Sequence, residues 1–304
     1  MQKICISLIN YNGQAQTLAC LNSLEELITP DISLFVVVID NASEILFQIG
    51  SRTYKNFSLK IIAEKENRGF SGGHNVGIRY GTSIQAEYIL ILNNDITVHK
   101  NLLVSLLTGF TDKKIGAVVP KIYFAKGHEF HKNKYTTKDL GNVLWYAGAS
   151  MDWDNIYGKH RGVDEVDHGQ YDLEELTELI TGCCALIKSE VFHNMGMFDE
   201  RYFLYYEDAD LSMRMKKQGY TIAYVPKAML WHINAGSTGG SGSDLQDYFL
   251  SRNRLLFGFS YGPFRTKVAM VKESLRLLNT GRVWQKKGIQ DFFLRKFGKG
   301  TYHV

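Results

Sequence analysis

A short acidic and aromatic segment offers the clearest chemistry in this sequence. Five acids and five aromatic residues are interleaved within residues 198–210, a density unlike that of a solvated charged surface. Aromatic neighbours exclude water from a carboxylate, which raises its pKa towards values useful for a general base. We therefore predict that Asp208, with Glu207 beside it, acts in catalysis. The alternative is that Asp208 and Asp210 cap a helix that begins here.

Two other aspartates follow apolar runs directly. Asp95 ends the turn Asn93-Asn94-Asp95, and Asp40 comes after residues 36–39. A carboxylate at a strand end can hold Mg²⁺ or Mn²⁺ against a diphosphate, because hard cations prefer oxygen ligands. Asp40 could instead accept hydrogen bonds from a uracil or thymine imide, or from a ribose hydroxyl. For both aspartates the alternative is a polar turn or cap that binds no ligand.

A glycine-rich segment, residues 67–75, precedes a predicted helix. Glycines let a backbone approach a ligand closely, and the free amides at a helix N-terminus favour anions. The segment matches neither the Walker A loop nor the G-x-G-x-x-G dinucleotide pattern. It therefore predicts either a donor-binding loop or merely a tight connection between a strand and a helix.

Three further side chains could contact a metal or a phosphate. His232 precedes a glycine- and serine-rich stretch, residues 234–244, which we expect to be mobile. A single histidine is either structural or a ligand. Arg252 and Arg254 lie in a predicted helix over residues 245–259, from which they could reach a diphosphate or form surface ion pairs.

The first 120 residues alternate short apolar runs with amphipathic stretches. We predict strands at residues 4–9, 34–39, 59–63 and 88–92, and helices at 14–27 and 74–82. Continuous β-branched strands that alternate with helices indicate the α/β class, with a mostly parallel sheet covered on both faces. Ligands bind at the carboxyl ends of such strands, so Asn10, Asp40 and Asp95 are expected to face one crevice.

The pattern changes after residue 122. Residues 123–178 are rich in glycine, aromatic and charged residues and predict long loops or a small β-excursion that serves as a binding surface. Regular structure resumes at Leu179, with a helix at residues 209–218 and strands at 222–225 and 229–233. The last forty residues are basic and amphipathic.

Composition narrows the classes of function. The chain has 304 residues, of which 45% are hydrophobic and 22% charged, and a net charge of +4. This balance suits phosphorylated ligands and is too weak to indicate nucleic-acid binding. The four cysteines fit small buried residues in a reducing compartment better than a disulfide framework. The sequence shows no signal-peptide pattern and no apolar run of membrane-spanning length, which predicts a cytoplasmic protein.

Taken together, these segments resemble family 2 glycosyltransferases, in particular the bacterial rhamnosyltransferase-like group. The resemblance runs in order along nearly the whole chain, through residues 6–13, 38–43, 67–75, 92–95, 145–148, 181–184, 196–211, His232 and 288–291. It implies a GT-A fold with a Rossmann-like sheet, a donor such as a UDP- or dTDP-sugar, a divalent cation (Mg²⁺ or Mn²⁺) and inversion at the anomeric carbon.

The resemblance also implies roles for individual residues. Asp95 would bind the metal with His232 as a second ligand, Asp208 would deprotonate the acceptor, and Asp40 would contact the nucleoside. Many relatives carry acids where Asn93 and Asn94 stand, so we expect the donor diphosphate to supply much of the metal coordination. The predicted donor contacts are Asn10, Asn12, Asp40, Asn67, Gly72, Asn75, Asn94 and Arg252.

These expectations divide the chain into three parts. Residues 1–120 form the half that binds the nucleotide sugar, residues 121–260 form the acceptor-binding and catalytic half of the same domain, and residues 261–304 form a helical extension. The predicted function is transfer of a sugar, rhamnose being one candidate, to a glycan or lipid-linked acceptor of a cell-surface polysaccharide. The basic stretch within the extension, residues 267–299, either lies on the inner face of an anionic membrane, or packs against the body or against a second subunit in a homodimer.

Two rival functions are considered. A sugar-1-phosphate nucleotidyltransferase would need a basic, glycine-rich loop after the first strand, where this chain reads Asn10-Tyr11-Asn12-Gly13. A catalytically inactive glycan-binding scaffold would not need Asp208 and His232, so their presence argues against it.

Overall fold

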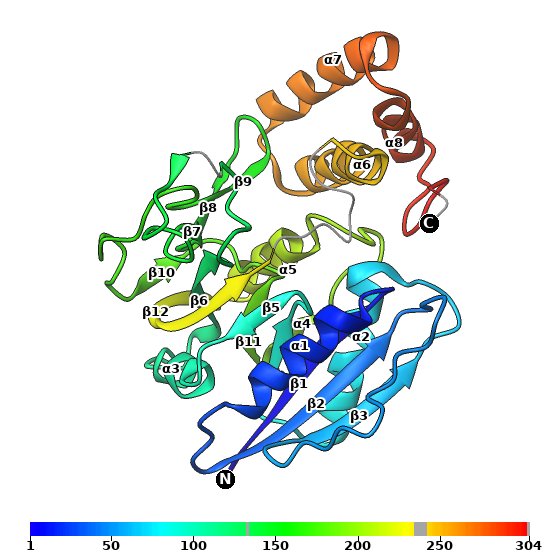
Figure 1. Ribbon diagram of the computed structural model, residues 1–304. Coiled ribbons are helices and arrows are strands. Elements are labelled where there is room, and N and C mark those ends of the chain that lie inside the picture. Colours follow the sequence, from blue (N-terminus) through cyan, green and yellow to red (C-terminus); the bar gives the residue numbers. More distant parts are fainter. Residues whose placement is uncertain (132–133, 234–241, 303–304) are drawn as a thin grey trace.

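A central mixed sheet runs through the computed structural model, which describes residues 1–131, 134–233 and 242–302 (Figure 1). Its strand order is β10-β12-β6-β11-β4-β1-β2-β3, with β5 and β7 paired at its side. The bounds of the strands are β1 Gln2–Asn10, β2 Ile32–Asp40, β3 Ser58–Ala63, β4 Tyr88–Leu92, β5 Ile96–Val98, β6 Ile115–Phe124, β7 Leu144–Tyr146, β10 Glu175–Thr177, β11 Cys184–Lys188 and β12 Thr221–His232.

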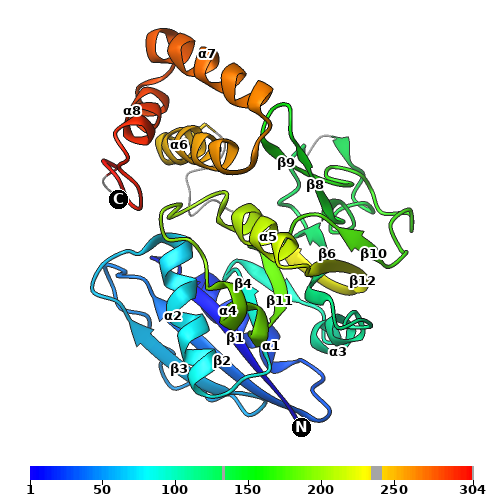
Figure 2. The same cartoon turned by 180° about the vertical axis from the view of Figure 1, so that it is seen from behind.

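The N-terminal part of the sheet is parallel, as predicted, with β4, β1, β2 and β3 side by side. Helix α1 (Gln14–Glu25) covers one face, and α2 (Gly69–Ser83) and α4 (Ser189–Met195) cover the other (Figures 1 and 2). Both faces of β1 are therefore buried, which explains why the strand reads as a continuous apolar run. The prediction of an α/β sheet with helices on both faces is confirmed.

Antiparallel pairing enters at β11, which lies between β4 and β6 and opposes both. Beyond it, β12 runs parallel to β6 as one long strand with an irregularity between Val225 and Met229, where the sequence predicts two strands. The short strand β5 pairs with the end of β12, so that Ile96 lies opposite His232. This pairing brings Asp95 next to His232, which lies 137 positions further along the chain.

The segment predicted as loops or a small β-excursion is a β-rich excursion. It contains β7, β10 and a separate two-stranded sheet of β8 (Ala149–Asp152) and β9 (Tyr157–His160). The ammonium of Lys121, which is buried in β6, forms ion pairs with Asp167 and Asp172 and fastens the excursion to the main sheet. A buried lysine is tolerated only when paired in this way.

Helices α6 (Asp244–Tyr261), α7 (Phe264–Thr280) and α8 (Val283–Phe293) follow the sheet. Tyr248 of α6 donates a hydrogen bond to Asp291 of α8, and Gly288 lies so close to the backbone of Tyr248 that a Cβ would collide there. Part of the basic tail thus packs against the body. The stretch predicted to be mobile lies, for residues 234–241, outside the described residues.

Two further predictions concern the cysteines and membrane-spanning segments. All four cysteines are buried and unpaired, as predicted. In the part of the chain that the structure describes, no helix combines the length and the apolar character needed to cross a membrane. The remaining helices are α3 (Leu102–Thr108) and α5 (Glu207–Lys217).

Candidate active site

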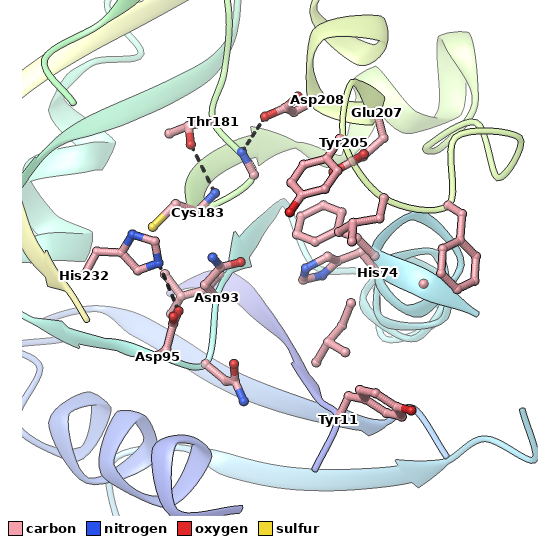
Figure 3. Close-up of a pocket in the computed structure, with 18 of the residues that line it drawn as sticks. Tyr11, His74, Asn93, Asp95, Thr181, Cys183, Tyr205, Glu207, Asp208 and His232 are labelled. Atoms are coloured by element: carbon pink, nitrogen blue, oxygen red, sulfur yellow. Dashed lines mark hydrogen bonds and ion pairs between the residues drawn. The ribbon is translucent and has the colours of Figure 1, made fainter. Parts of the chain in front are cut away.

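A cavity of about 710 Å³ opens at the carboxyl ends of β1 and β4. Its size is typical of a site for a small organic ligand, and its place at this edge of the sheet is the expected one for an α/β fold. Six of the predicted site residues line it, namely Asn67, Asn94, Asp95, Glu207, Asp208 and His232. Figure 3 shows Asp95 and His232 together on one side of the cavity and Asp208 with Glu207 on another.

Asp95 and His232 form a hydrogen-bonded pair, with 3.1 Å between Asp95 Oδ1 and His232 Nε2 (Figure 3). The imidazole is only 5% exposed, and the edge of the Trp145 ring packs against it with 4.8 Å between ring centroids. Its Nδ1 is buried and has no hydrogen-bond partner within the described part of the chain. A buried histidine with one unsatisfied nitrogen is the kind of exception that calls for an explanation such as a ligand.

The pair fits two ligands of one divalent cation. Adjacent ligands of an octahedral Mg²⁺ or Mn²⁺ ion, each about 2.1 Å from it, lie about 3 Å apart. The carboxylate oxygen and the imidazole nitrogen have this separation and both belong to the cavity lining. No group of three or more His, Cys, Asp or Glu side chains that could hold a metal occurs among the described residues. A bound substrate or water could supply further ligands.

Asp208 lies in the first turn of α5, next to the cavity. Its Oδ2 accepts a hydrogen bond from the Gly182 amide at 3.0 Å, and its Oδ1 accepts one from the Ala209 amide at 2.7 Å. Burial raises the pKa of the Asp208 carboxyl, and these amide hydrogen bonds oppose that effect only in part. The result is a fixed carboxylate that holds a proton more readily than an exposed aspartate does.

The capping alternative for these acids is not what the structure shows. The residue at the N-cap of α5 is Tyr206. Asp210 binds Arg214 one turn further on and also accepts a hydrogen bond from the Tyr261 hydroxyl. Asp210 is therefore committed to holding α5 in place, whereas Asp208 faces the cavity.

Glu207 is more deeply buried than its neighbour. Burial, and then the charge of Asp208, raise the pKa of the Glu207 carboxyl well above its ordinary value. Its Oε2 has no hydrogen-bond partner in the described residues. Burial thus favours the protonated form of the Glu207 carboxyl, which is suited to donating a hydrogen bond and unsuited to accepting a proton.

The loop before α5 has a strained backbone that side chains of α6 hold in place. Phe203, Tyr205 and Tyr206 have φ angles of 64°, 68° and 72°, which only glycine adopts without cost. The side-chain amide of Asn253 donates hydrogen bonds to the carbonyl oxygens of Tyr202, Leu204 and Tyr205, at 2.8, 2.7 and 2.9 Å. Sequence reasoning missed Asn253, because no local pattern marks a residue whose partners lie about fifty positions away.

Arg252 does not line the cavity, contrary to the expectation that it reaches a diphosphate from α6. Its side chain is fully buried. The guanidinium donates to the carbonyl oxygens of Arg201, Tyr202 and Gly298, which leaves it directed into the protein. Arg254, the other basic residue of α6 considered above, pairs with Glu273 of α7. The structure therefore gives both arginines a place in packing of the C-terminal helices.

Most of the glycine-rich segment lies in a helix, and Asn67, Gly69, Phe70 and His74 line the cavity, so its expected role in donor binding stays a prediction. Helix α2 begins at Gly69, five residues earlier than predicted. The amides of Phe70 and Ser71 both donate to the carbonyl oxygen of Phe203, and a Cβ on Gly69 would collide with that oxygen. The amides that could have bound an anion are therefore occupied by the loop that leads to Asp208.

Gly72 and Asn75 also lie outside the cavity lining. Asn75 accepts a hydrogen bond from the Phe198 amide and donates to the Phe198 carbonyl, at 3.0 and 2.9 Å. Gly72 packs against Arg68. Asn75 thus fastens the start of the acidic and aromatic segment. Asn67, which does line the cavity, accepts hydrogen bonds from Asn41 and from the Gly69 amide.

The polar residues at the ends of β1 and β2 form hydrogen bonds within the protein. Asp40 is buried and accepts hydrogen bonds from the amides of Ser43 and Phe47, as an Asx turn does. Asn10 donates to Ser43 and accepts from Thr17, and Asn12 accepts from the Glu44 amide. None of the three is part of the cavity lining, so their expected contacts with the donor stay predictions. Asn94 lines the cavity and donates to Thr17 at 2.8 Å.

The cavity also contains residues that the sequence did not single out as a site. His160, from the β-rich excursion, packs against Trp145 beside His232. Burial lowers the pKa of His160 to about 4 and that of His74, which is bonded to Ser7, to about 3. Both imidazoles are therefore neutral at physiological pH. The only sequence signal for His160 was the composition of the excursion, whereas Trp145 also belongs to the segment 145–148 of the family resemblance.

Comparison with known proteins identifies the family of the chain. The family model described as Glycosyl transferase family 2 matches residues 5–196. The chain is 26% identical over 226 residues to the low-salt glycan biosynthesis hexosyltransferase Agl10 of Haloferax volcanii. The aligned region covers 74% of this chain and 67% of that protein. It is 47% identical over 60 residues to an N-acetylglucosaminyl-diphospho-decaprenol L-rhamnosyltransferase of Mycobacterium tuberculosis, or 20% of each chain.

Solved structures show the same fold. The structure of GalNAc-T7 with UDP, GalNAc and Mn²⁺ superposes with a TM-score of 0.61 at 15% sequence identity, over 90% of this chain and 54% of that one. The fold is thus the GT-A fold of glycosyltransferases, as predicted. Since the family model covers well over half of the sequence, the chain belongs to glycosyl transferase family 2 and is a glycosyltransferase.

Proposed function

We propose that this enzyme transfers a sugar from a UDP- or dTDP-linked donor, with inversion, to a glycan or lipid-linked acceptor at the cytoplasmic face of a membrane. Rhamnose is one candidate sugar, supported by the name of the mycobacterial relative. The product would belong to a cell-surface polysaccharide, which the name of the Haloferax relative supports in part. The observation that carries the proposal is that one cavity holds a half-buried carboxylate, Asp208, apart from a metal-type pair, Asp95 and His232.

Asp208 serves as the base in this proposal. As the acceptor oxygen attacks the anomeric carbon, the Asp208 carboxylate takes the proton of that hydroxyl. The amides of Gly182 and Ala209 fix its orientation, and each carboxylate oxygen keeps a second position for accepting a hydrogen bond. Because burial raises its pKa, the acid limb of the pH–rate profile should lie at higher pH than for an exposed aspartate.

Asp95 and His232 hold the divalent cation in this proposal. A bound cation would offset the negative charge that develops on the leaving diphosphate. Asp95 supplies the anionic ligand, and His232 supplies a neutral nitrogen whose direction the Trp145 ring fixes. The presence of Mn²⁺ in the structure of GalNAc-T7 supports the choice of a divalent cation.

The test is the substitution Asp208→Asn, which keeps the shape of the side chain and removes its basicity. We expect the rate of transfer to fall by about 10²–10⁴-fold, the contribution of a positioned general base, while donor binding with Mn²⁺ stays unchanged. Asp199→Asn makes the same change in the same acidic segment outside the cavity lining, and should leave transfer intact. Near-normal transfer by Asp208→Asn would rule out the assignment of the base.

A further inference from the structure

The positive charge of this chain is concentrated at one end. Residues 261–304 carry ten Lys and Arg side chains against two acidic ones, a net charge of +8. The first 260 residues therefore have a net charge of −4, although the whole chain is +4. Such an asymmetry indicates that this end of the molecule meets an anionic partner.

Helix α7 has apolar side chains on the side that faces away from the protein. Its inner face is made by Thr266, Met270 and Ser274, which are buried and spaced four residues apart. On the opposite side Phe264 is 82% exposed and Leu275 is 65% exposed, and Val268 lies between them. A helix at a protein surface normally has the reverse arrangement, with its apolar stripe inward.

Basic side chains border this outer stripe. Arg265, Lys272 and Arg276 are exposed, and helical geometry places them roughly 60–100° from Phe264 or Leu275, along one edge of the stripe. In Figures 1 and 2, α7 is the outermost element, beyond α6 and α8 and on the far side of the molecule from the N-terminus. Nothing in the described chain covers its outer face.

We infer that the outer face of α7 binds the surface of an anionic lipid bilayer. Phe264, Val268 and Leu275 would enter the boundary between head groups and acyl chains, and Arg265, Lys272 and Arg276 would contact lipid phosphates. A second copy of this chain fits the face less well, because it would bring two stretches of charge +8 together. The inference depends on charge and exposure, and it holds whatever the donor sugar is.

Co-sedimentation of the full chain with vesicles tests this inference. We expect binding to vesicles of phosphatidylcholine with phosphatidylglycerol at low salt, and little binding to phosphatidylcholine alone or at high salt. Leu275→Ser and the double change Lys272→Glu with Arg276→Glu should each weaken the partition coefficient about tenfold or more. The matched controls, Leu173→Ser at a leucine that is 82% exposed and Lys60→Glu with Lys65→Glu, should bind like the original protein.

Three outcomes would overturn the inference. The first is failure of the original protein to bind anionic vesicles at low salt. The second is binding that the α7 variants retain. The third is a dimer in light scattering that Leu275→Ser converts to a monomer without changing vesicle binding, which would make the face a contact between copies. Since no donor or metal is present in these assays, none of the outcomes bears on the assignment of Asp208.

Discussion

The two sides of the cavity hold their carboxylates by different means. Asp95 lies between β4 and β5, and the pairing of Ile96 with His232 sets it beside the imidazole through the main chain of the sheet. Asp208 follows a loop whose strained backbone is held by Asn253, from a helix that comes later in the sequence. The proposed metal pair is therefore positioned by the sheet, whereas the position of the proposed base depends on the packing of α6.

This difference has an energetic side. Residues other than glycine in the left-handed region cost on the order of 1–3 kcal/mol each, and the loop contains three of them close together. Three hydrogen bonds from one buried amide are a local source of stabilisation that offsets such a cost. The geometry of the base should consequently respond to changes in α6 that leave the metal side untouched.

The largest effect on the proposed metal side is expected from Asp95→Asn. Loss of the anionic ligand should lower kcat/KM by about 10²–10³-fold, comparable to removing one electrostatic contact with a leaving group. The same variant should need more Mn²⁺ for half-maximal activity, and a chelator should abolish transfer by the original protein until Mn²⁺ is restored. Transfer assays over a Mn²⁺ titration provide the measurement.

The control for this prediction is Asp154→Asn, at an exposed aspartate outside the cavity lining. It should titrate with Mn²⁺ like the original protein. If Asp95→Asn instead had an unchanged Mn²⁺ requirement, the pair with His232 would be a structural hydrogen bond and the metal side of the comparison would be wrong.

A smaller effect is expected from Asn253→Ala, which removes the amide that holds the loop. Carbonyl oxygens left without a donor should lower the free energy of unfolding by about 2–3 kcal/mol. We expect kcat to fall about tenfold, since small displacements of a catalytic group cost activity, while the affinity for donor with Mn²⁺ stays the same. The acid limb of the pH–rate profile should also move, because the surroundings of Asp208 change.

The control is Asn279→Ala at the exposed end of α7. A loss of stability without any change in the pH–rate profile or in kcat would show that Asn253 supports only the fold. An equal loss of donor affinity would show that the two sides of the cavity are coupled through the sheet.

Sequence reasoning found the regular elements of the sheet because their patterns are local. Strand β4 has its predicted bounds, and α1 and β2 differ by no more than two residues at either end. Local patterns do not distinguish Asp40 from Asp95, because each aspartate directly follows an apolar strand. The turn after Asp40 folds back, and its backbone amides donate hydrogen bonds to the Asp40 carboxylate. After Asp95, the chain continues into β5, and the Asp95 side chain stays in the cavity lining.

Composition was enough to predict that the acidic and aromatic segment contributes to the cavity, but not to predict its surroundings. The density of acids and aromatic rings pointed to Asp208, which lines the cavity, because that signal lies within a few residues. The environment of the segment is made by Asn75, Gly69 and Asn253, which are distant in sequence and act through the main chain of residues 198–205. Arg252 was misread for the same reason, as its partners become visible only once α6 is packed.

The smallest expected effect concerns Glu207, which lines the same side of the cavity as Asp208. Because its pKa in the folded protein is raised above the unfolded value, its contribution to stability is complete at low pH and is lost as pH rises towards the folded pKa. Glu207→Gln removes this loss, so its Tm should exceed that of the original protein by about 2–4 °C at pH 8. At pH 4 the two proteins should melt together, and Glu174→Gln at an exposed glutamate should show no difference at either pH. Thermal unfolding at both pH values measures this. Equal Tm values at pH 8 would mean that this side of the cavity tolerates a charged Glu207, and that the strain there lies in the backbone alone.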